Sequence, residues 1–135
     1  MTDTLKKETS CDVLVIGSGA GGMATAITAA KAGQQVIIVE KEPVYGGTTA
    51  FSGGVLWIPG NHHCGEDDSR QEAETYLKSE TGNFYQSDAV EAFLRAGPEM
   101  LKFFETETAV QFIPTLYPDY HPDAPGGVEV GRSVL

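Results

Sequence analysis

An apolar run followed by a glycine-rich turn constrains this chain more than any other feature. The run Val13 to Ile16 leads into three spaced glycines, and an alanine-rich stretch follows them. A second apolar run, Val36 to Val39, ends at Glu40. Strand, glycine turn, helix and a second strand that ends in an acid form the order of a βαβ dinucleotide-binding unit. The chain is therefore predicted to be an α/β protein with a Rossmann-like parallel sheet.

Each glycine of the turn has a separate task that depends on its missing Cβ. Gly17 permits the tight turn, Gly19 lets the backbone approach a pyrophosphate, and Gly22 lets helix and strand pack closely. The pyrophosphate would lie on free N–H groups at a helix N-terminus, where the helix dipole favours an anion. Glu40 has the spacing of an acid that binds the adenosine ribose. The alternative, a glycine turn that binds nothing, leaves this acid unexplained. The predicted nucleotide contacts are Gly17, Ser18, Gly19, Ala20, Gly21, Gly22, Glu40 and Lys41.

Two glycine pairs flank small hydroxyl residues soon after the second strand. The pairs are Gly46–Gly47 and Gly53–Gly54. In an NAD-binding domain the chain would usually continue into another crossover here, whereas this strip can lie flat against a flavin and its ribityl-phosphate chain. Paired glycines alone could be mere turns, so the prediction depends on the βαβ unit before them. FAD rather than NAD is the predicted cofactor. Its expected contacts in the strip are Gly47, Thr48, Thr49, Ser52, Gly53 and Gly54.

Helix and turn signals alternate along the rest of the chain. The helix of the βαβ unit is expected over residues 23–31, with Gly33 as its stop. Residues 42–65 are rich in glycine and proline, which predicts a long loop with short strands. Ser69 begins a capping box of the form S-x-x-E, and the helix that follows is expected to end at Gly82.

A second helical region is predicted to start at Ser87 and to break at Gly97–Pro98. A proline inside a helix removes a hydrogen bond and clashes with the preceding turn, so a new helix is expected from Pro98. Val110 to Ile113 is predicted as a strand. Residues 114–127 contain four prolines and are predicted as loop.

The charge balance narrows the classes of partner. The net charge of −10 disfavours nucleic acid and anionic membranes, and a solvated helical surface is sufficient to explain it. No apolar run approaches the length of a membrane span, and the N-terminus lacks the apolar core of a signal peptide. A cytoplasmic location is the resulting expectation.

One cluster of potential metal ligands follows the strip. His62, His63 and Cys64 precede three acids at positions 66–68. Adjacent histidines in an acidic loop lack the separated ligand pairs of zinc sites, so no metal is predicted. Cys11 and Cys64 do not form a disulfide framework.

These motifs together resemble the start of the fumarate-reductase-like FAD flavoproteins. The segments that carry the resemblance are Gly17–Gly22, Val39–Lys41, Gly46–Gly54 and Leu56–Asn61. Within that family the 3-ketosteroid dehydrogenase branch is most similar. The segments that resemble it are Trp57–Asn61, Ala73–Leu77, Gly97–Leu101, Tyr117–Gly127 and Gly131–Ser133.

The resemblance implies a reaction and one supporting residue. Steroid 1-dehydrogenases use a tyrosine to remove a proton beside the ring ketone while a hydride passes to flavin N5. Tyr120 matches a tyrosine that supports the proton-abstracting one, and the alternative is that it only packs a proline-rich loop. A phenol is a poor base at neutral pH, so such support is chemically sensible. His121 stands where many steroid dehydrogenases have another aromatic residue, which leaves steroid specificity open.

Two further expectations concern polar residues. Asp119, His121 and Asp123 could form a proton relay or cap turns between prolines, and turn capping is favoured. FAD is expected to be non-covalent, because relatives that link flavin carry a histidine near residues 46–52 and none is present there.

The resemblance also implies how the chain is organised. Residues 1–135 are expected to be the N-terminal part of an FAD-binding domain, because family members are several times longer. Residues 12–54 would hold the fingerprint and the flavin-facing strip, and residues 66–135 a helical and loop segment that leads toward the substrate. Alone, the chain is expected to be inactive and to need the missing C-terminal part or a partner subunit.

Three functions remain open at this point. The first is dehydrogenation of a hydrophobic, steroid-like ketone, with the electron acceptor unspecified. The second is reduction of an activated alkene carboxylate, and the third is a truncated, non-catalytic nucleotide-binding domain.

Overall fold

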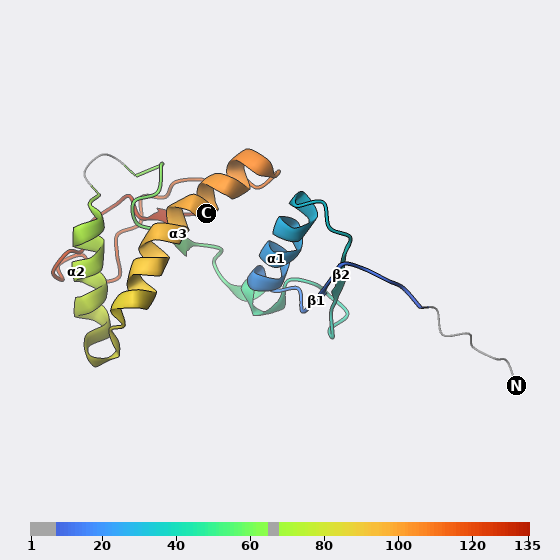
Figure 1. The fold of residues 1–135 in the computed structure, drawn as a ribbon. Coiled ribbons are helices and arrows are strands. Elements are labelled where there is room, and N and C mark those ends of the chain that lie inside the picture. Colours follow the sequence, from blue (N-terminus) through green and yellow to red (C-terminus); the bar gives the residue numbers. More distant parts are fainter. Residues whose placement is uncertain (1–7, 65–67) are drawn as a thin grey trace, which may run out of the picture. The chain divides into compact units, whose positions relative to one another are not determined.

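The computed structural model describes residues 8–64 and 68–135 (Figure 1). The chain divides into two compact units, the first ending at Gly54 and the second starting at Val55.

The first unit is the predicted βαβ element. Strand β1 (Val13–Ile16) is followed by helix α1 (Ala20–Lys31) and strand β2 (Val36–Val39). The two strands pair in parallel, with Val13 opposite Val36. Helix α1 packs against both strands, as Figure 1 shows. The α/β prediction is therefore confirmed, and α1 begins three residues earlier than expected.

The strands of this unit are covered on one face. Val15 and Ala26 are buried between β1 and α1. Side chains alternate between the faces of a strand, so Leu14 and Ile16 point the other way. They are 55% and 81% exposed, respectively. Of the described residues of this unit, those of α1 form its one α-helix, and α1 covers one face of the two strands.

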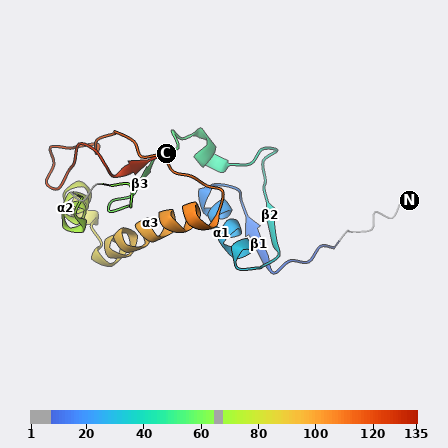
Figure 2. The ribbon, with the colours of Figure 1, turned by 90° about the horizontal axis from the view of Figure 1, so that it is seen from above.

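The second unit is built around two helices and a short sheet. Its two α-helices are α2 (Arg70–Thr81) and α3 (Ser87–Glu107), and the short 3-10 helix η2 (Gly82–Phe84) lies between them in the chain. Strands β3 (Leu56–Trp57) and β4 (Ser133–Val134) pair antiparallel. Figure 2 shows α2 nearly end-on beside the start of α3, and the two helices are in contact. The buried core consists of Ile58, Leu101 and Val134, with Met100 and Phe112 packed against it.

Helix α2 begins and ends as its sequence predicts. The Ser69 hydroxyl oxygen accepts a hydrogen bond of 3.1 Å from the Glu72 backbone N–H. At the other end Gly82 adopts φ of 49°, a left-handed value that favours glycine. The capping prediction is confirmed at both ends.

Helix α3 runs without a break through Pro98, so the prediction of two separate helices was wrong. Its buried residues Leu94, Gly97, Leu101 and Phe104 recur at helical spacing on both sides of the proline. A Cβ on Gly97 would lie 3.2 Å from a methyl carbon of Ile58, which shows how closely the helix approaches the core there. Burial of one continuous apolar face outweighs the hydrogen bond that the proline removes.

Residues 110–113 are not a strand, although part of this segment runs beside β4. Ile113 and Leu135 exchange two backbone hydrogen bonds of 2.8 Å, and Pro114 forms an isolated bridge with Val134. Past the proline, the Thr115 N–H donates to the Ser133 carbonyl oxygen at 3.0 Å, so the contact with β4 continues on both sides of Pro114. The prediction of a strand over Val110 to Ile113 was therefore wrong, and the pairing with β4 was not anticipated.

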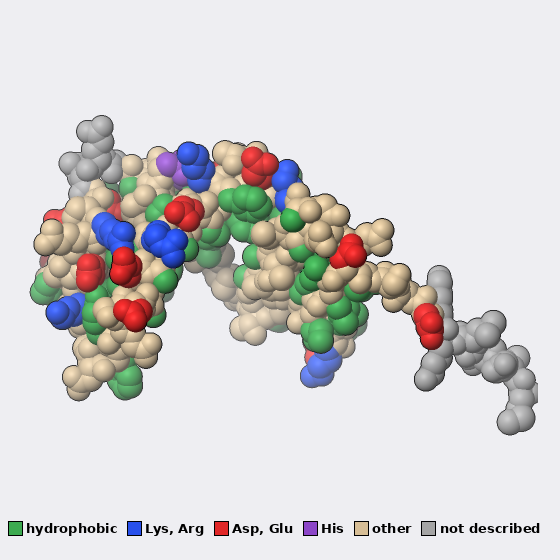
Figure 3. Space-filling model, viewed as in Figure 1, with side chains coloured by type: hydrophobic (Ala, Val, Ile, Leu, Met, Phe, Trp, Pro, Cys, Tyr) green, Lys and Arg blue, Asp and Glu red, His purple; other side chains and the backbone are tan. Residues whose placement is uncertain are grey.

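Charged side chains of both signs are interspersed on the surface of α2 and α3 (Figure 3). This is the solvated helical surface that the composition predicts. None of the described helices is both long enough and apolar enough to cross a membrane.

Candidate functional site

The first candidate site is the turn between β1 and α1. Gly17 has φ of 97°, which a residue with a side chain rarely adopts. A Cβ on Gly22 would lie 2.1 Å from the Gly17 carbonyl oxygen, so the packing of helix on strand excludes one. A Cβ on Gly19, by contrast, would meet only the Thr49 hydroxyl oxygen, at 3.9 Å. The space beside Gly19 is therefore left open, as the approach of a pyrophosphate requires.

The strip of residues 46–54, with its threonine and serine hydroxyls, folds back onto the N-terminus of α1. Its central part is the 3-10 helix η1 (Gly47–Phe51). The Thr49 hydroxyl oxygen accepts a hydrogen bond of 3.2 Å from the Ala20 N–H, in the first turn of α1. A Cβ on Gly47 would lie 3.1 Å from the Gly19 Cα, so the two glycines let the backbones touch. The two predicted FAD-binding segments therefore form one cradle.

Glu40 closes this cradle at the end of β2. Its carboxylate accepts hydrogen bonds from the Ser18 hydroxyl, from the Ser18 N–H at 2.8 Å and from the Lys41 N–H at 2.8 Å. Hydrogen bonds, first among them that of the Ser18 hydroxyl, lower the pKa of Glu40 to about 2. The Ser18 oxygen in turn accepts from the Gly46 N–H at 2.9 Å. Glu40 is thus an ionised acceptor that ties the turn to the strip, and its contact with a ribose stays a prediction.

The other predicted cofactor residues lie at the edge of the cradle or at the surface. The Ser52 hydroxyl donates to the Thr49 carbonyl oxygen at 2.8 Å and accepts from the Gly54 N–H at 3.1 Å, which ends η1. Thr48 is exposed within η1. Lys41 pairs with Glu42 at the surface. A Cβ on Gly21 or Gly53 would meet no atom within 4 Å, so these positions are open to a ligand.

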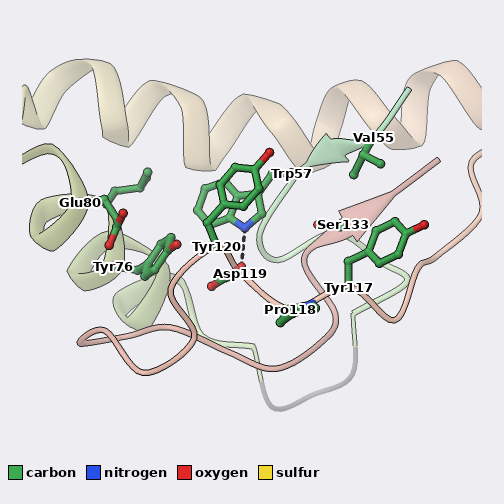
Figure 4. A pocket seen from close by; sticks show the side chains of 10 residues that line it. Val55, Trp57, Tyr76, Glu80, Tyr117, Pro118, Asp119, Tyr120 and Ser133 are labelled. Atoms are coloured by element: carbon green, nitrogen blue, oxygen red, sulfur yellow. Dashed lines mark hydrogen bonds between the residues drawn. The ribbon is translucent and has the colours of Figure 1, made fainter. Parts of the chain in front are cut away.

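The second candidate site is a pocket of about 440 Å³ within the second unit (Figure 4). Apolar and aromatic side chains make up most of its wall, as in many small-molecule sites. Tyr120 lies in that wall and is 98% exposed, so its phenol is free of described packing. The lining residues are Val55, Trp57, Tyr76, Leu77, Glu80, Tyr117, Pro118, Asp119, Tyr120 and Ser133.

A buried charged network holds the pocket wall beside Tyr120. Asp119 accepts hydrogen bonds from the Trp57 indole N–H at 2.6 Å and from Arg132 Nη1 at 2.8 Å. Arg132 Nε donates to Asp68 at 2.8 Å. The side chains of Asp119 and Arg132 are each 1% exposed. Separating two buried charges is costly, because each would be left without its partner. The network therefore holds the backbone beside Tyr120 in place.

This network was not predicted as a site. Arg132 lies in the segment Gly131–Ser133 that resembles the steroid-dehydrogenase branch, and Asp119 was predicted to cap a turn, with a proton relay as the alternative. Asp119 also accepts the Val128 N–H at 3.1 Å, across the loop between these two residues. His121 bonds to Glu80, at 2.8 Å, and not to Asp119, so Asp119 and His121 do not share a relay. No local spacing signals a pair that only the fold brings together.

The two adjacent histidines contact a residue that was not predicted with them. His62 and His63 both face the carboxylate of Glu105, near the end of α3. Burial raises the pKa of Glu105, but hydrogen bonds from His63 and the Phe112 N–H shift it downward overall. Cys64 donates to the Gly131 carbonyl oxygen instead. The acids at positions 66 and 67, part of the cluster considered above, lie outside the described residues.

A parallel βαβ unit with a glycine cradle defines the class of dinucleotide-binding α/β proteins. A family model described as "FAD binding domain" matches residues 12–132, so the chain belongs to that family of flavoproteins. This confirms the predicted fold class and FAD as the cofactor. The non-covalent state of the FAD stays a prediction.

Curated relatives and solved structures agree with this assignment. A 4-oxocyclohex-2-ene-1-carboxylate 5-dehydrogenase of Sinomonas cyclohexanicum is 50% identical over 100% of this chain and 24% of its own length. A 3-oxosteroid 1-dehydrogenase of Mycobacterium tuberculosis is 44% identical over 91% of this chain and 23% of its own. The crystal structure of 3-ketosteroid delta1-dehydrogenase from Sterolibacterium denitrificans, in complex with 1,4-androstadiene-3,17-dione, matches with a TM-score of 0.84 and 42% identity. That match covers 92% of this chain and 22% of the solved chain. The chain thus spans about a quarter of the length of these relatives, and the resemblance to the steroid-dehydrogenase branch is confirmed.

Proposed function

We propose that this chain supplies the FAD cradle and part of the substrate pocket of a dehydrogenase that inserts a carbon–carbon double bond beside a ring ketone. The observation that carries this proposal is the pocket lined by Tyr120 in a chain that also holds the cradle. Relatives that match nearly the whole chain are dehydrogenases of cyclic ketones by name.

The residues of the cradle would bind FAD in a fixed orientation. The N-terminus of α1 and the open space at Gly19 would receive the pyrophosphate. Thr48, Thr49 and Ser52 would offer hydroxyl groups to the ribityl chain and the flavin ring. FAD, when bound, supplies the acceptor for the hydride that leaves the substrate. With no histidine in residues 46–52, this strip offers no side chain for a histidine-linked flavin.

Tyr120 would support removal of the proton beside the ketone. Its phenol is exposed in the pocket wall, and its backbone neighbour Asp119 is fixed by Arg132 and Trp57. A hydroxyl held in this way can donate a hydrogen bond to the tyrosine or substrate oxygen that gains negative charge. The Tyr120 side chain therefore acts as an acid–base support, whereas Asp119 and Arg132 only position it.

The substrate is a cyclic ketone with a largely apolar body, because the pocket wall is mostly aromatic and aliphatic. A 3-ketosteroid and an oxocyclohexane carboxylate both meet this description, and relatives of both kinds match the chain. Reduction of an alkene carboxylate is less well supported. A urocanate reductase of Eggerthella lenta is 47% identical but matches only 39% of this chain.

Anaerobic stopped-flow reduction of the bound flavin tests the proposal, with the enzyme at its full natural length. A 3-ketosteroid and 4-oxocyclohexanecarboxylate would be supplied in parallel, and mass spectrometry would detect a product lighter by two hydrogens. We expect one of the two ketones to bleach the flavin. If neither does so, while the reduced flavin is reoxidised by an alkene carboxylate, the enzyme is a reductase instead.

A further inference from the structure

Two histidines and a glutamate from distant parts of the sequence converge at one point of the second unit. His62 Nε2 lies 2.5 Å from one carboxylate oxygen of Glu105, and His63 Nε2 lies 2.8 Å from the other. The three ligand atoms all lie within 4.8 Å of one another. The imidazole rings are adjacent, with centroids 4.2 Å apart and planes tilted by 36°, and each presents its Nε2 to Glu105.

This arrangement has the chemistry of a metal site. Two imidazole nitrogens and one carboxylate oxygen are the ligand set of known three-residue zinc sites, which keep a fourth position for water. Neutral imidazoles select zinc and its neighbours among the transition metals, whereas magnesium and calcium prefer oxygen ligands alone. We propose that His62, His63 and Glu105 bind one divalent transition-metal ion of the zinc type.

The distances allow this with small movements. Zinc binds nitrogen and oxygen ligands at about 2.0–2.2 Å, which places tetrahedral ligands roughly 3.3 Å apart. The carboxylate oxygens must therefore recede from the imidazoles by less than about an ångström. The side chains of His62 and His63 are 45% and 25% exposed, so an ion and its water can enter from solvent.

The ion would have a structural role. None of the three ligands lines the pocket. Its effect would be to join the turn at residues 61–64 to the end of α3, next to Phe112, whose N–H donates to Glu105 at 3.2 Å. Since an ion that binds only the folded protein stabilises it by mass action, zinc should raise the melting temperature.

Calorimetric titration with zinc chloride tests the site, using chelator-treated protein at its full natural length. We expect one zinc ion per chain in the wild type, and a loss of affinity of at least tenfold in Glu105→Gln and in His63→Ala. Cobalt chloride provides a second measurement, because tetrahedral cobalt gives intense visible absorption that these two variants should lack. The test needs no enzyme activity, so its outcome is separate from that of the proposed function.

Matched variants exclude general surface binding. Glu99→Gln changes an exposed acid on the same helix, and His121→Gln changes the third histidine of the chain. Cys64→Ser removes the adjacent thiol, which contacts Gly131 instead of the cluster. All three should bind zinc like the wild type, and flavin absorbance verifies that each variant is folded. Absence of saturable zinc binding in the wild type, or unchanged affinity in Glu105→Gln, would overturn the proposal and leave a hydrogen-bonded clasp.

Discussion

The two units build their candidate sites by opposite means. In the first unit, the cradle depends on side chains that are missing, since Gly17 needs a left-handed backbone and Gly22 needs contact with the turn. In the second unit, the pocket wall depends on buried charges, held by the pair of Asp119 and Arg132. Backbone-built sites tolerate almost no added atom, whereas sites built from side chains tolerate changes of shape but not the loss of a partner. Substitutions in each unit should therefore fail in different ways.

The largest effect is expected from Gly22→Ala. The added Cβ would lie 2.1 Å from the Gly17 carbonyl oxygen, and backbone atoms on both sides cannot move apart without unpacking α1 from β1. Circular dichroism should show that the first unit no longer folds. Flavin absorbance should show that FAD is no longer bound.

The matched variant is Gly19→Val, three residues before Gly22. Its side chain enters open space, with the Thr49 oxygen 3.9 Å from the Cβ, so the fold should persist while the flavin is lost. A Gly19→Val protein that stays yellow would remove the pyrophosphate from this position. A folded, yellow Gly22→Ala protein would contradict the comparison between the units.

In the second unit, Asp119→Asn is expected to lower the free energy of unfolding by about 3 kcal/mol. Removing one partner of a buried ion pair costs about 3–5 kcal/mol, and the lower end applies because Arg132 keeps its bond to Asp68. Trp57 is the single tryptophan of this chain and donates to Asp119, so its fluorescence reports unfolding of this unit directly.

Asp123→Asn is the control for that experiment, because it neutralises an exposed acid of the same loop. It should change the unfolding free energy by no more than about 0.5 kcal/mol. Equal destabilisation by the two variants would mean that overall charge, rather than the buried network, holds the pocket wall.

Tyr120→Phe should affect the reaction and leave stability unchanged. The ring is 98% exposed, so the hydroxyl contributes little to packing. Loss of acid–base support is expected to slow flavin reduction by roughly ten- to a thousandfold. Stopped-flow kinetics in the full-length enzyme measures this, with Tyr85→Phe as a control outside the pocket. An unchanged rate would mean that the Tyr120 hydroxyl takes no part in the reaction.

The same contrast explains how far the sequence could be interpreted. The cradle lies within about forty residues, and each of its glycines has a local reason, so the fingerprint predicted the parallel βαβ unit and the cofactor. Trp57 and Asp119 are separated by 62 residues, and His63 and Glu105 by 42. Pairs this distant leave no periodic signal, so the charged network and the convergence on Glu105 required the fold.

Local rules failed where tertiary contacts opposed them. Pro98 predicted a break, but the apolar face that passes through Gly97 and Leu101 is buried against Ile58 and keeps α3 continuous. Residues 110–113 have the composition of a strand, yet the described pairing beside β4 begins at Ile113 and continues through Pro114 to Thr115. In both cases the amino acids were interpreted correctly one by one, and the outcome was decided by which surface they met.

The smallest expected effect concerns the acid stability of the first unit. The folded-state pKa of Glu40 is lowered from 4.5 to about 2, with the Ser18 hydroxyl as the leading cause. A lowered pKa in the folded state stabilises the protein at pH values above 4.5, and this contribution is lost as the pH falls toward 2.

Ser18→Ala should raise the pKa of Glu40 toward its ordinary value, so that the carboxyl gains its proton earlier in an acid titration. Carboxyl-carbon NMR of Glu40 measures this directly. The control is Ser52→Ala, because the Ser52 hydroxyl bonds to Thr49 and Gly54, and in this variant Glu40 should titrate as it does in the wild type. If Ser18→Ala also titrates like the wild type, the backbone N–H groups alone hold the carboxylate, and the first unit would be built by its backbone even at this polar contact.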